Sequence, residues 1–200
     1  MTSPGRRERK KAQTRQSLAE AALELFLKRG YEKVSVAEVA DAADVSVTTL
    51  FKHFPSKEAL VFDMDAEMEA ALVAAIRDRP EDQSIPQALR EHIVRGTHRR
   101  ADSSMREFLR MVEETPALRD YAQRMWLRHE TAVAHAIAAE IGAPDDDLTC
   151  AALARFALSA PQLISHTDNP RSAAEQVFEI LDAGWACLHP DVSARGGGAT

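Results

Sequence analysis

The sequence predicts an all-α protein, and three observations support this fold class. Alanine is abundant, and alternating runs of β-branched residues are nearly absent. Apolar residues recur with helical spacing along most of the chain. Helix-capping patterns, in which Ser precedes Glu or Gln by three residues, stand before several of these stretches. We expect about nine helices, divided between a three-helix N-terminal head and a larger helical body.

The chain begins with a basic stretch and a first amphipathic helix. Residues 1–13 carry a cluster of Arg and Lys without apolar partners, so we expect a flexible arm, which is either a solvated tail or a DNA contact. The helix is expected over residues 14–29, where Leu18, Ala22 and Phe26 share a face. Gly30 then ends it as a C-cap glycine.

Residues 35–60 carry the pattern of a helix-turn-helix. Ser35 and Glu38 form a capping box for a helix over residues 36–43. Asp44 interrupts that helix, and Ser46 caps a second one over residues 47–53. Pro55 ends the second helix, because a residue before proline disfavours the α conformation.

The short helix over residues 47–53 has one apolar and one polar face. Leu50 and Phe54 point inward in this pattern. The β-branched run Val47-Thr48-Thr49 is a poor choice for a helix that only meets water. We therefore interpret the polar face as a binding surface, with an ordinary solvated face as the alternative.

Residues 44–60, from Asp-Val-Ser to Lys-Glu-Ala-Leu, resemble the DNA-binding signature of TetR-family transcriptional regulators, and the resemblance extends over about residues 14–60. It implies a DNA-binding domain at residues 14–58. Thr49, Phe51 and His53 fall at positions that usually touch the DNA backbone, and Lys57 at a common phosphate contact. The full set expected at DNA is Arg15, Ser35, Ser46, Val47, Thr48, Thr49, Phe51, Lys52, His53 and Lys57.

Three residues depart from the family pattern. Phe51 stands where Tyr is usual, which removes a hydroxyl group that would reach a phosphate. Asp44 stands where Gly is usual in the turn, although Asp tolerates a left-handed conformation better than most residues. Thr48 replaces a residue that is often small, so the base preference is expected to change.

The charge distribution agrees with a DNA-binding head. The chain as a whole has a net charge of −6. Residues 1–57 hold 11 Lys/Arg against 7 Asp/Glu, a net of +4, and the rest holds 14 against 24, a net of −10. A basic head on an acidic body suits a protein that binds nucleic acid with its N-terminal part.

The body is expected over residues 59–190, with a disordered tail at 191–200. Its helices are expected at residues 57–77, 84–98, from 104, 115–141, 145–166 and 170–188. Pro161 should kink the penultimate helix. In the family the helix at residues 57–77 joins the head to the body.

The last two helices have more apolar surface than one side of a small domain needs. They are either buried within the chain or form a two-fold dimer interface. Family resemblance implies a homodimer, whose two recognition helices would read a palindrome. The residues expected at the interface are Leu153, Phe156, Ala157, Leu163, Ile164, Val177, Phe178, Leu181 and Trp185.

Two histidines on otherwise apolar faces suggest a ligand site in the body. Apolar walls with a few polar points suit a small molecule, and the family's usual effector is small and often hydrophobic. The alternative is that these side chains are ordinary core residues. The candidates are His92, Met105, Phe108, Met125, Trp126, His129 and Phe156, with Met111 nearby.

We therefore expect a cytoplasmic DNA-binding regulator, most simply a repressor released from a palindromic operator by a small hydrophobic ligand. The alternative is an activator or adaptor with the same helix-turn-helix and no small effector. We find no phosphate loop, nucleophile elbow or metal-ligand spacing in the sequence, so we expect no enzyme, cofactor or metal. No apolar run is long enough for a membrane helix. Cys150 and Cys187 are expected as small core residues, with a disulfide between them as the alternative.

Overall fold

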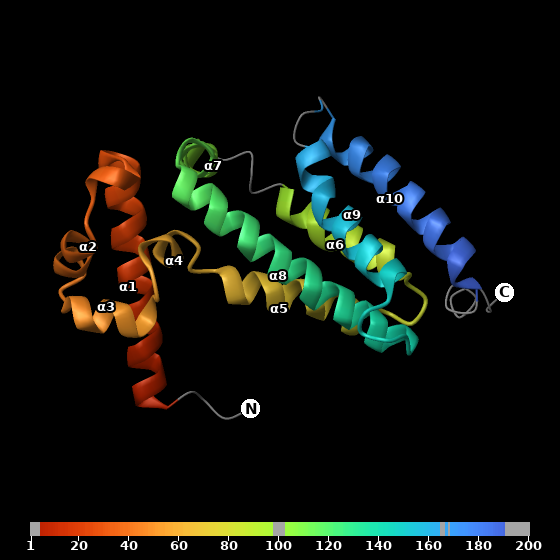
Figure 1. The fold of residues 1–200 in the computed structure, drawn as a ribbon, viewed down its shortest axis with the longest axis horizontal. Helices are drawn as coiled ribbons and strands as arrows, with labels where there is room; N and C mark the ends of the chain where they lie inside the picture. The colour runs from red at the N-terminus through yellow and green to blue at the C-terminus, as the bar shows by residue number, and fades with distance from the viewer. Residues whose placement is uncertain (1–4, 98–102, 165–166, 168, 191–200) are drawn as a thin grey trace. The chain divides into compact units, whose positions relative to one another are not determined.

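The computed structural model describes residues 5–97, 103–164, 167 and 169–190, and these residues form helices joined by short loops (Figure 1). No strand occurs among them, so the all-α class is confirmed. The elements are α1 (Arg6–Arg29), η1 (Tyr31–Lys33), α2 (Val36–Ala42), α3 (Val47–His53), α4 (Lys57–Val61), α5 (Asp65–Arg77), α6 (Ile85–Thr97), α7 (Ser103–Glu114), α8 (Pro116–Ile141), α9 (Leu148–Ile164) and α10 (Pro170–Leu188).

The chain forms two compact units. The first comprises Met1–Asp65 and Ser103–Gln123, and the second comprises Ala66–Asp102 and Arg124–Thr200. This division differs from the expected domains, 14–58 and 59–190, because α7 and the first turns of α8 pack with the helix-turn-helix. Leu118 of α8 is fully buried in the core of the first unit. The predicted tail at residues 191–200 lies outside the described residues.

The core of the first unit is built around α1. Its apolar stripe, which includes Leu18, Ala22 and Phe26, packs with Leu50, Phe54 and further buried side chains of α2 and α4. Each of these five side chains is at most 1% exposed. The predicted inward face of α3 is therefore correct, and this burial is what holds a helix of seven residues in place.

α1 begins at Arg6, whereas the sequence predicted a flexible arm as far as residue 13. The Glu8 carboxylate accepts a hydrogen bond of 3.1 Å from the backbone N–H of Gly5, which closes the first turn. A negative side chain in the first turn also interacts favourably with the helix dipole. The basic residues that were expected in the arm therefore extend α1, and residues 1–4 lie outside the described part.

The helix expected over residues 57–77 is interrupted by a turn at residues 62–64, which separates α4 from α5 (Figure 1). Phe62 stacks on Tyr121 with a centroid distance of 5.3 Å, and it meets the edge of Phe108 at 6.2 Å. The Arg15 guanidinium donates a hydrogen bond of 2.7 Å to the Asp63 carbonyl. These contacts hold the backbone out of helical register, so a single rod from head to body is not observed.

The core of the second unit lies among α5, α6, α8, α9 and α10. α10 packs on both α6 and α9. The Asp182 carboxylate of α10 accepts hydrogen bonds from Ser84 and Gln87 at the start of α6. These bonds hold α10 against the start of α6. Pro161 lies inside α9 as expected, and its side chain is buried.

The turn between α2 and α3 is a Schellman motif centred on Asp44. Asp44 has a φ of 53°. Among the described residues other than glycine, it is the one with a positive φ. The Val45 N–H donates to the Ala40 carbonyl at 2.9 Å, and the Asp44 N–H donates to the Asp41 carbonyl at 3.1 Å. These bonds satisfy carbonyls that the end of α2 would leave without partners.

Replacing Asp44 should therefore change stability through the backbone. We expect Asp44→Gly to raise the free energy of unfolding and Asp44→Ala to lower it, with a difference of about 1–2 kcal/mol between the two variants. Urea unfolding followed by circular dichroism measures this. Asp41→Gly, the same substitution inside α2, is the control and should destabilise. Equal effects of glycine at both positions would contradict the strain at Asp44.

Candidate nucleic-acid interface

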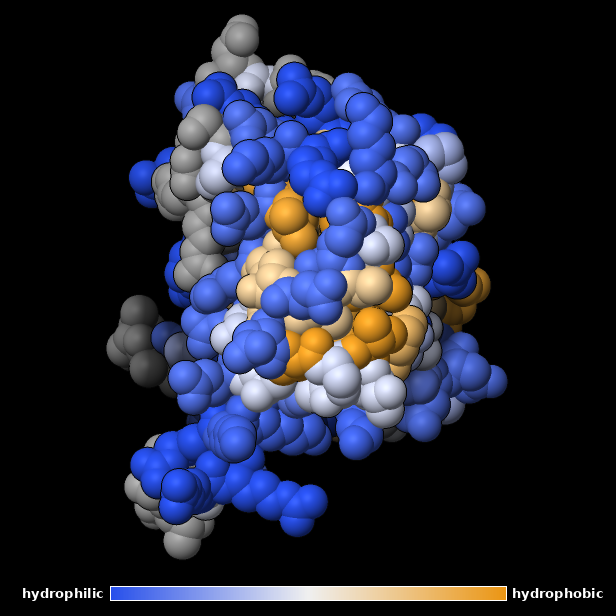
Figure 2. Space-filling view, turned by 90° about the vertical axis from the view of Figure 1, so that its left-hand side faces the viewer, coloured by the Kyte–Doolittle hydropathy of each residue, from blue (hydrophilic) through white to orange (hydrophobic). Residues whose placement is uncertain are grey.

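α3 presents an exposed face that is free of contacts with the core. The Ser46 hydroxyl accepts a hydrogen bond of 3.2 Å from the Thr49 N–H and so caps the helix. Val47, Thr48, Phe51 and Lys52 are exposed on its outer face. In the view of the side that carries α2 and α3, a patch of hydrophobic residues lies at the surface and is surrounded by hydrophilic residues (Figure 2). α3 therefore offers methyl groups, hydroxyls, an aromatic ring and a cation to a partner.

Ser35 caps α2 and is held in the predicted capping box. The Glu38 N–H donates to the Ser35 hydroxyl at 3.2 Å, and the Ser35 N–H donates to the Glu38 carboxylate at 2.8 Å. The Ser35 N–H, and then the Arg29 side chain, lower the pKa of Glu38 to about 2. Ser35 and Ser46 thus both have an established local role, and both remain exposed.

His53 ends α3 and lies close to positive side chains of α1. Partial burial, followed by the charges of Lys11 and Arg15, lowers the pKa of His53 below its usual value of 6.5. The neutral imidazole is therefore favoured in the free protein. A neutral imidazole can donate one hydrogen bond to a phosphate oxygen, and an approaching phosphate would favour its protonation.

Lys57, which was expected as a phosphate contact, is held by η1 in this structure. Its Nζ donates a hydrogen bond of 2.6 Å to the Tyr31 carbonyl and lies 4.0 Å from the centroid of the Tyr31 ring. The Tyr31 hydroxyl donates to the Glu58 carboxylate at 2.9 Å. Burial is the main reason that the pKa of Tyr31 lies well above its usual range. Lys57 and Glu58 therefore attach the start of α4 to η1.

Arg15 was also expected to contact DNA, but its guanidinium is directed into the first unit. Nη1 donates to the His53 carbonyl at 3.0 Å, and Nη2 donates to the Asp63 carbonyl at 2.7 Å. The guanidinium carbon lies 4.4 Å from the centroid of the Phe54 ring. The structure thus gives this side chain contacts that the helical pattern of the sequence did not reveal.

The residues expected at a ligand are divided between the two units. Met105 and Phe108 belong to α7 in the first unit. His92, Met125, Trp126, His129 and Phe156 belong to the second unit. His129 is fully buried, and its ring meets that of Trp126 edge-on with a centroid distance of 5.3 Å. Phe156 is 59% exposed, in contrast to the buried Met125 and His129.

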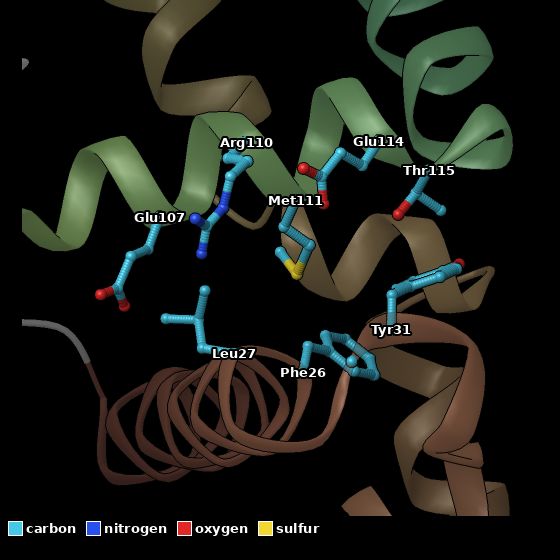
Figure 3. A pocket seen from close by; sticks show the side chains of 9 residues that line it. Phe26, Leu27, Tyr31, Glu107, Arg110, Met111, Glu114 and Thr115 are labelled. Atoms are coloured by element: carbon cyan, nitrogen blue, oxygen red, sulfur yellow. The ribbon is translucent and has the colours of Figure 1, made fainter.

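A pocket of about 190 Å³ lies in the first unit, between the end of α1 and α7. Met111 and Arg110 point from α7 toward α1, where Phe26 and Leu27 lie (Figure 3). Met111, noted near the expected ligand site, is among the lining residues, and none of the seven candidates is. The pocket is lined by Phe26, Leu27, Gly30, Tyr31, Glu107, Arg110, Met111, Glu114 and Thr115.

The expected dimer interface contains five residues that lie in the chain's own core. Leu153, Ala157, Ile164, Phe178 and Trp185 are at most 5% exposed within the second unit. Val177 and Leu181 are partly buried against the same core. The five buried side chains therefore stabilise the single chain, while Val177 and Leu181 keep part of their surface exposed. Phe156 and Leu163, in contrast, are 59% and 63% exposed.

Other apolar side chains of α9 and α10 are exposed as well. Leu148 is 80% exposed, and it shares with Phe156 and Leu163 a spacing of eight and seven residues that places all three on one face of α9. On α10, Ile180 is 72% exposed and Leu188 is 63% exposed. The apolar arc of α9 is so wide that the sequence did not reveal which part faces inward. We call these five residues the α9–α10 apolar surface.

Among the described residues, no group of three or more His, Cys, Asp or Glu side chains is arranged to hold a metal ion. None of the described helices combines the length and the apolar character needed to cross a membrane.

The chain matches known regulators over most of its length. A family model described as "Bacterial regulatory proteins, tetR family" matches residues 18–64, and one described as "MftR C-terminal domain" matches residues 83–192. The regulator TcmR of Streptomyces glaucescens is 34% identical over 152 residues, which cover 72% of this chain and 67% of TcmR. The putative mycofactocin biosynthesis regulator MftR of Mycobacterium tuberculosis is 26% identical over 142 residues, which cover 70% of this chain and 71% of MftR.

A solved structure resembles the fold as well. The TetR-family repressor FadR of Thermus thermophilus, solved in complex with lauroyl-CoA, superposes with a TM-score of 0.53. It is 26% identical in sequence, and the match covers 84% of this chain and 92% of the FadR chain. The first family model spans the helix-turn-helix of α2 and α3, and the second model and TcmR each cover more than half of the chain. The chain belongs to the TetR family and is a DNA-binding transcriptional regulator.

Proposed function

We propose that the protein is a repressor that binds a palindromic operator as a homodimer and is released by a small apolar ligand. The observation that carries this proposal is the exposed face of α3, whose opposite face is anchored in the core by Leu50 and Phe54. The second candidate is an activator or adaptor that uses the same α3 face and has no small effector.

The chemistry of the α3 face suits the major groove of DNA. The methyl groups of Val47 and Thr48 can contact thymine methyl groups, and the Thr48 hydroxyl can bond to a base edge. Lys52 is exposed and can neutralise a phosphate. Phe51 is 49% exposed and carries no hydroxyl, so it would pack against the sugar–phosphate backbone without a hydrogen bond.

The first turns of α1 add positive charge to this unit. Arg6, Arg7, Arg9, Lys10 and Lys11 are all exposed, and the segment is helical from Arg6. An ordered row of cations attracts the phosphate backbone without reading sequence. This supports the part of the proposal in which α1 contributes salt-dependent affinity and α3 contributes base preference.

A homodimer follows from the short length of α3 and from the α9–α10 apolar surface. One helix of seven residues reaches only a few base pairs, so a specific site needs two copies related by a two-fold axis. The exposed apolar side chains of α9 and α10 would pack against the same helices of a second chain. Burying such side chains is favourable by about 25 cal/mol per Å² of apolar area.

The second unit is the proposed position of the ligand. Here Met125 and the buried His129 lie on α8, with Trp126 against the His129 ring. Burial, and then the charge of Arg95, lowers the pKa of His92, which favours the neutral imidazole. Apolar side chains with neutral polar points suit a largely apolar ligand. Because FadR is solved with lauroyl-CoA, the first probe is lauroyl-CoA, whose acyl chain is the apolar part that such a site would take.

Substitutions on α3 should separate phosphate contacts from base reading. We expect Lys52→Ala to weaken binding to a selected operator and to random DNA alike, and to reduce the slope of log K against log salt by about 0.9. Thr48→Ala should instead change the base preference in a selection from random duplexes and leave that slope unchanged. Fluorescence anisotropy at several salt concentrations measures both. Equal losses for operator and random DNA in both variants would contradict base reading by α3.

A charge on the α9–α10 apolar surface should separate the protomers. We expect Phe156→Glu to convert the dimer to a monomer in sedimentation velocity, because the dimer would bury an unpaired carboxylate. Leu127→Glu is the matched control, since Leu127 is 47% exposed on α8 and lies outside this surface. The control should remain dimeric. A Phe156→Glu protein that is still a dimer would refute this interface.

Lauroyl-CoA should stabilise the free protein and release it from DNA. At a ligand concentration 100 times the dissociation constant, the stabilisation is about 2.7 kcal/mol, which is roughly 5–10 °C in the unfolding midpoint of a chain of this size. Differential scanning fluorimetry and operator competition measure the two effects, with coenzyme A lacking the acyl chain as the control. If neither lauroyl-CoA nor other lipophilic compounds release the operator, the activator or adaptor without an effector is favoured.

A further inference from the structure

Arg15 joins three segments of the first unit through one planar group. It lies on α1 and is half-buried. One guanidinium nitrogen donates to the carbonyl of His53, the last residue of α3, at 3.0 Å. The other terminal nitrogen donates at 2.7 Å to the carbonyl of Asp63, in the turn between α4 and α5. The group also lies over the ring of Phe54, 4.4 Å from its centroid.

The accepting carbonyls belong to the last residue of α3 and to a turn, and helical hydrogen bonds do not fix the backbone at either place. The last four carbonyls of any α-helix have no partner within that helix, and the His53 carbonyl is one of them. Phe54 has an extended conformation, with a φ of −132°, so α3 cannot continue. Asp63 lies in the interruption between α4 and α5. A guanidinium presents several N–H groups in a fixed plane and can bond to two carbonyls at once.

We propose that Arg15 is a positioning residue, which fixes the C-terminal end of α3 relative to α1 and to the turn at residues 62–64. This inference rests on the proposed DNA-binding function of α3. It revises the expectation that Arg15 contacts a phosphate, because both terminal nitrogens are directed to backbone carbonyls. Arg15 acts on DNA recognition through α3, by setting the direction in which Lys52 and His53 leave the last turn.

Lysine at this position distinguishes the two roles. A lysine keeps the positive charge, so it can replace an arginine that contacts a phosphate. Its ammonium is a single point and lacks the planar fork needed to hold the His53 and Asp63 carbonyls together. If Arg15 positions α3, Arg15→Lys should therefore behave like Arg15→Ala.

The test compares full-length Arg15→Lys and Arg15→Ala with Lys11→Ala, an exposed basic residue one turn earlier on α1. The probes are a duplex selected from a random pool by the wild-type protein and a random-sequence duplex. We expect both Arg15 variants to lose affinity for the selected duplex by about tenfold or more, as for the loss of a charge-assisted hydrogen bond. Their salt slopes on random DNA should equal that of the wild type, while Lys11→Ala should reduce the slope by about 0.9.

Two results would overturn the assignment. Wild-type affinity in Arg15→Lys, together with a reduced salt slope in Arg15→Ala, would make Arg15 a phosphate contact. Loss of the helical circular dichroism of Arg15→Lys would make it a general stability residue.

Amide hydrogen exchange of the DNA-free proteins gives an independent readout. Arg15→Lys should exchange faster at the last turn of α3 and at residues 62–64, with α6, α9 and α10 unchanged, and wild-type exchange at these sites would contradict positioning. If the wild-type protein binds no duplex in a salt-dependent way, the proposed function fails. The exchange measurement would then still decide whether Arg15 holds α3.

Discussion

The structure of the DNA-binding unit depends on the burial of Leu50 and Phe54, the two anchors of α3. A helix of seven residues is unstable alone, because nucleation fixes several backbone angles for few hydrogen bonds. Both anchors are almost completely buried in the core built by α1. This burial fixes one face of α3 and leaves the opposite face to meet a partner. The Schellman turn at Asp44 and the hydroxyl cap of Ser46 then set where the helix begins.

α1 organises the unit beyond this core. Its end continues into η1, where Tyr31 accepts a hydrogen bond from Lys57 and donates one to Glu58. The aromatic contacts of Phe62 with Phe108 and Tyr121 bring α7 and α8 into the same unit. α8 is a continuous helix whose first turns belong to the first unit and whose remaining turns belong to the second. The ligand proposed at α8 would therefore act on a helix that continues into the unit that carries α3.

Local sequence patterns predicted the features that neighbouring residues determine. The features that were predicted wrongly depend on contacts between residues far apart in the sequence. The bounds of α3 were predicted correctly because Ser46 and Pro55 act within a few residues of the helix ends. The interruption at residues 62–64 could not be predicted, since the apolar spacing continues through Leu60 and Met64 while the break depends on Tyr121 and Arg15. On α9, apolar residues occupy so wide an arc that the sequence assigned Leu153 and Ala157 to the dimer although they lie in the chain's own core.

The proposed repressor requires that α3 enters the major groove of two half-sites related by a two-fold axis. Methylation protection on the selected operator is the decisive measurement, because it reports access to guanine N7 in the major groove. We expect two protected clusters of guanines, centred about 10 base pairs apart or a multiple of that distance, with equal protection in the two half-sites. A single cluster, or protection confined to adenines in the minor groove, would contradict it.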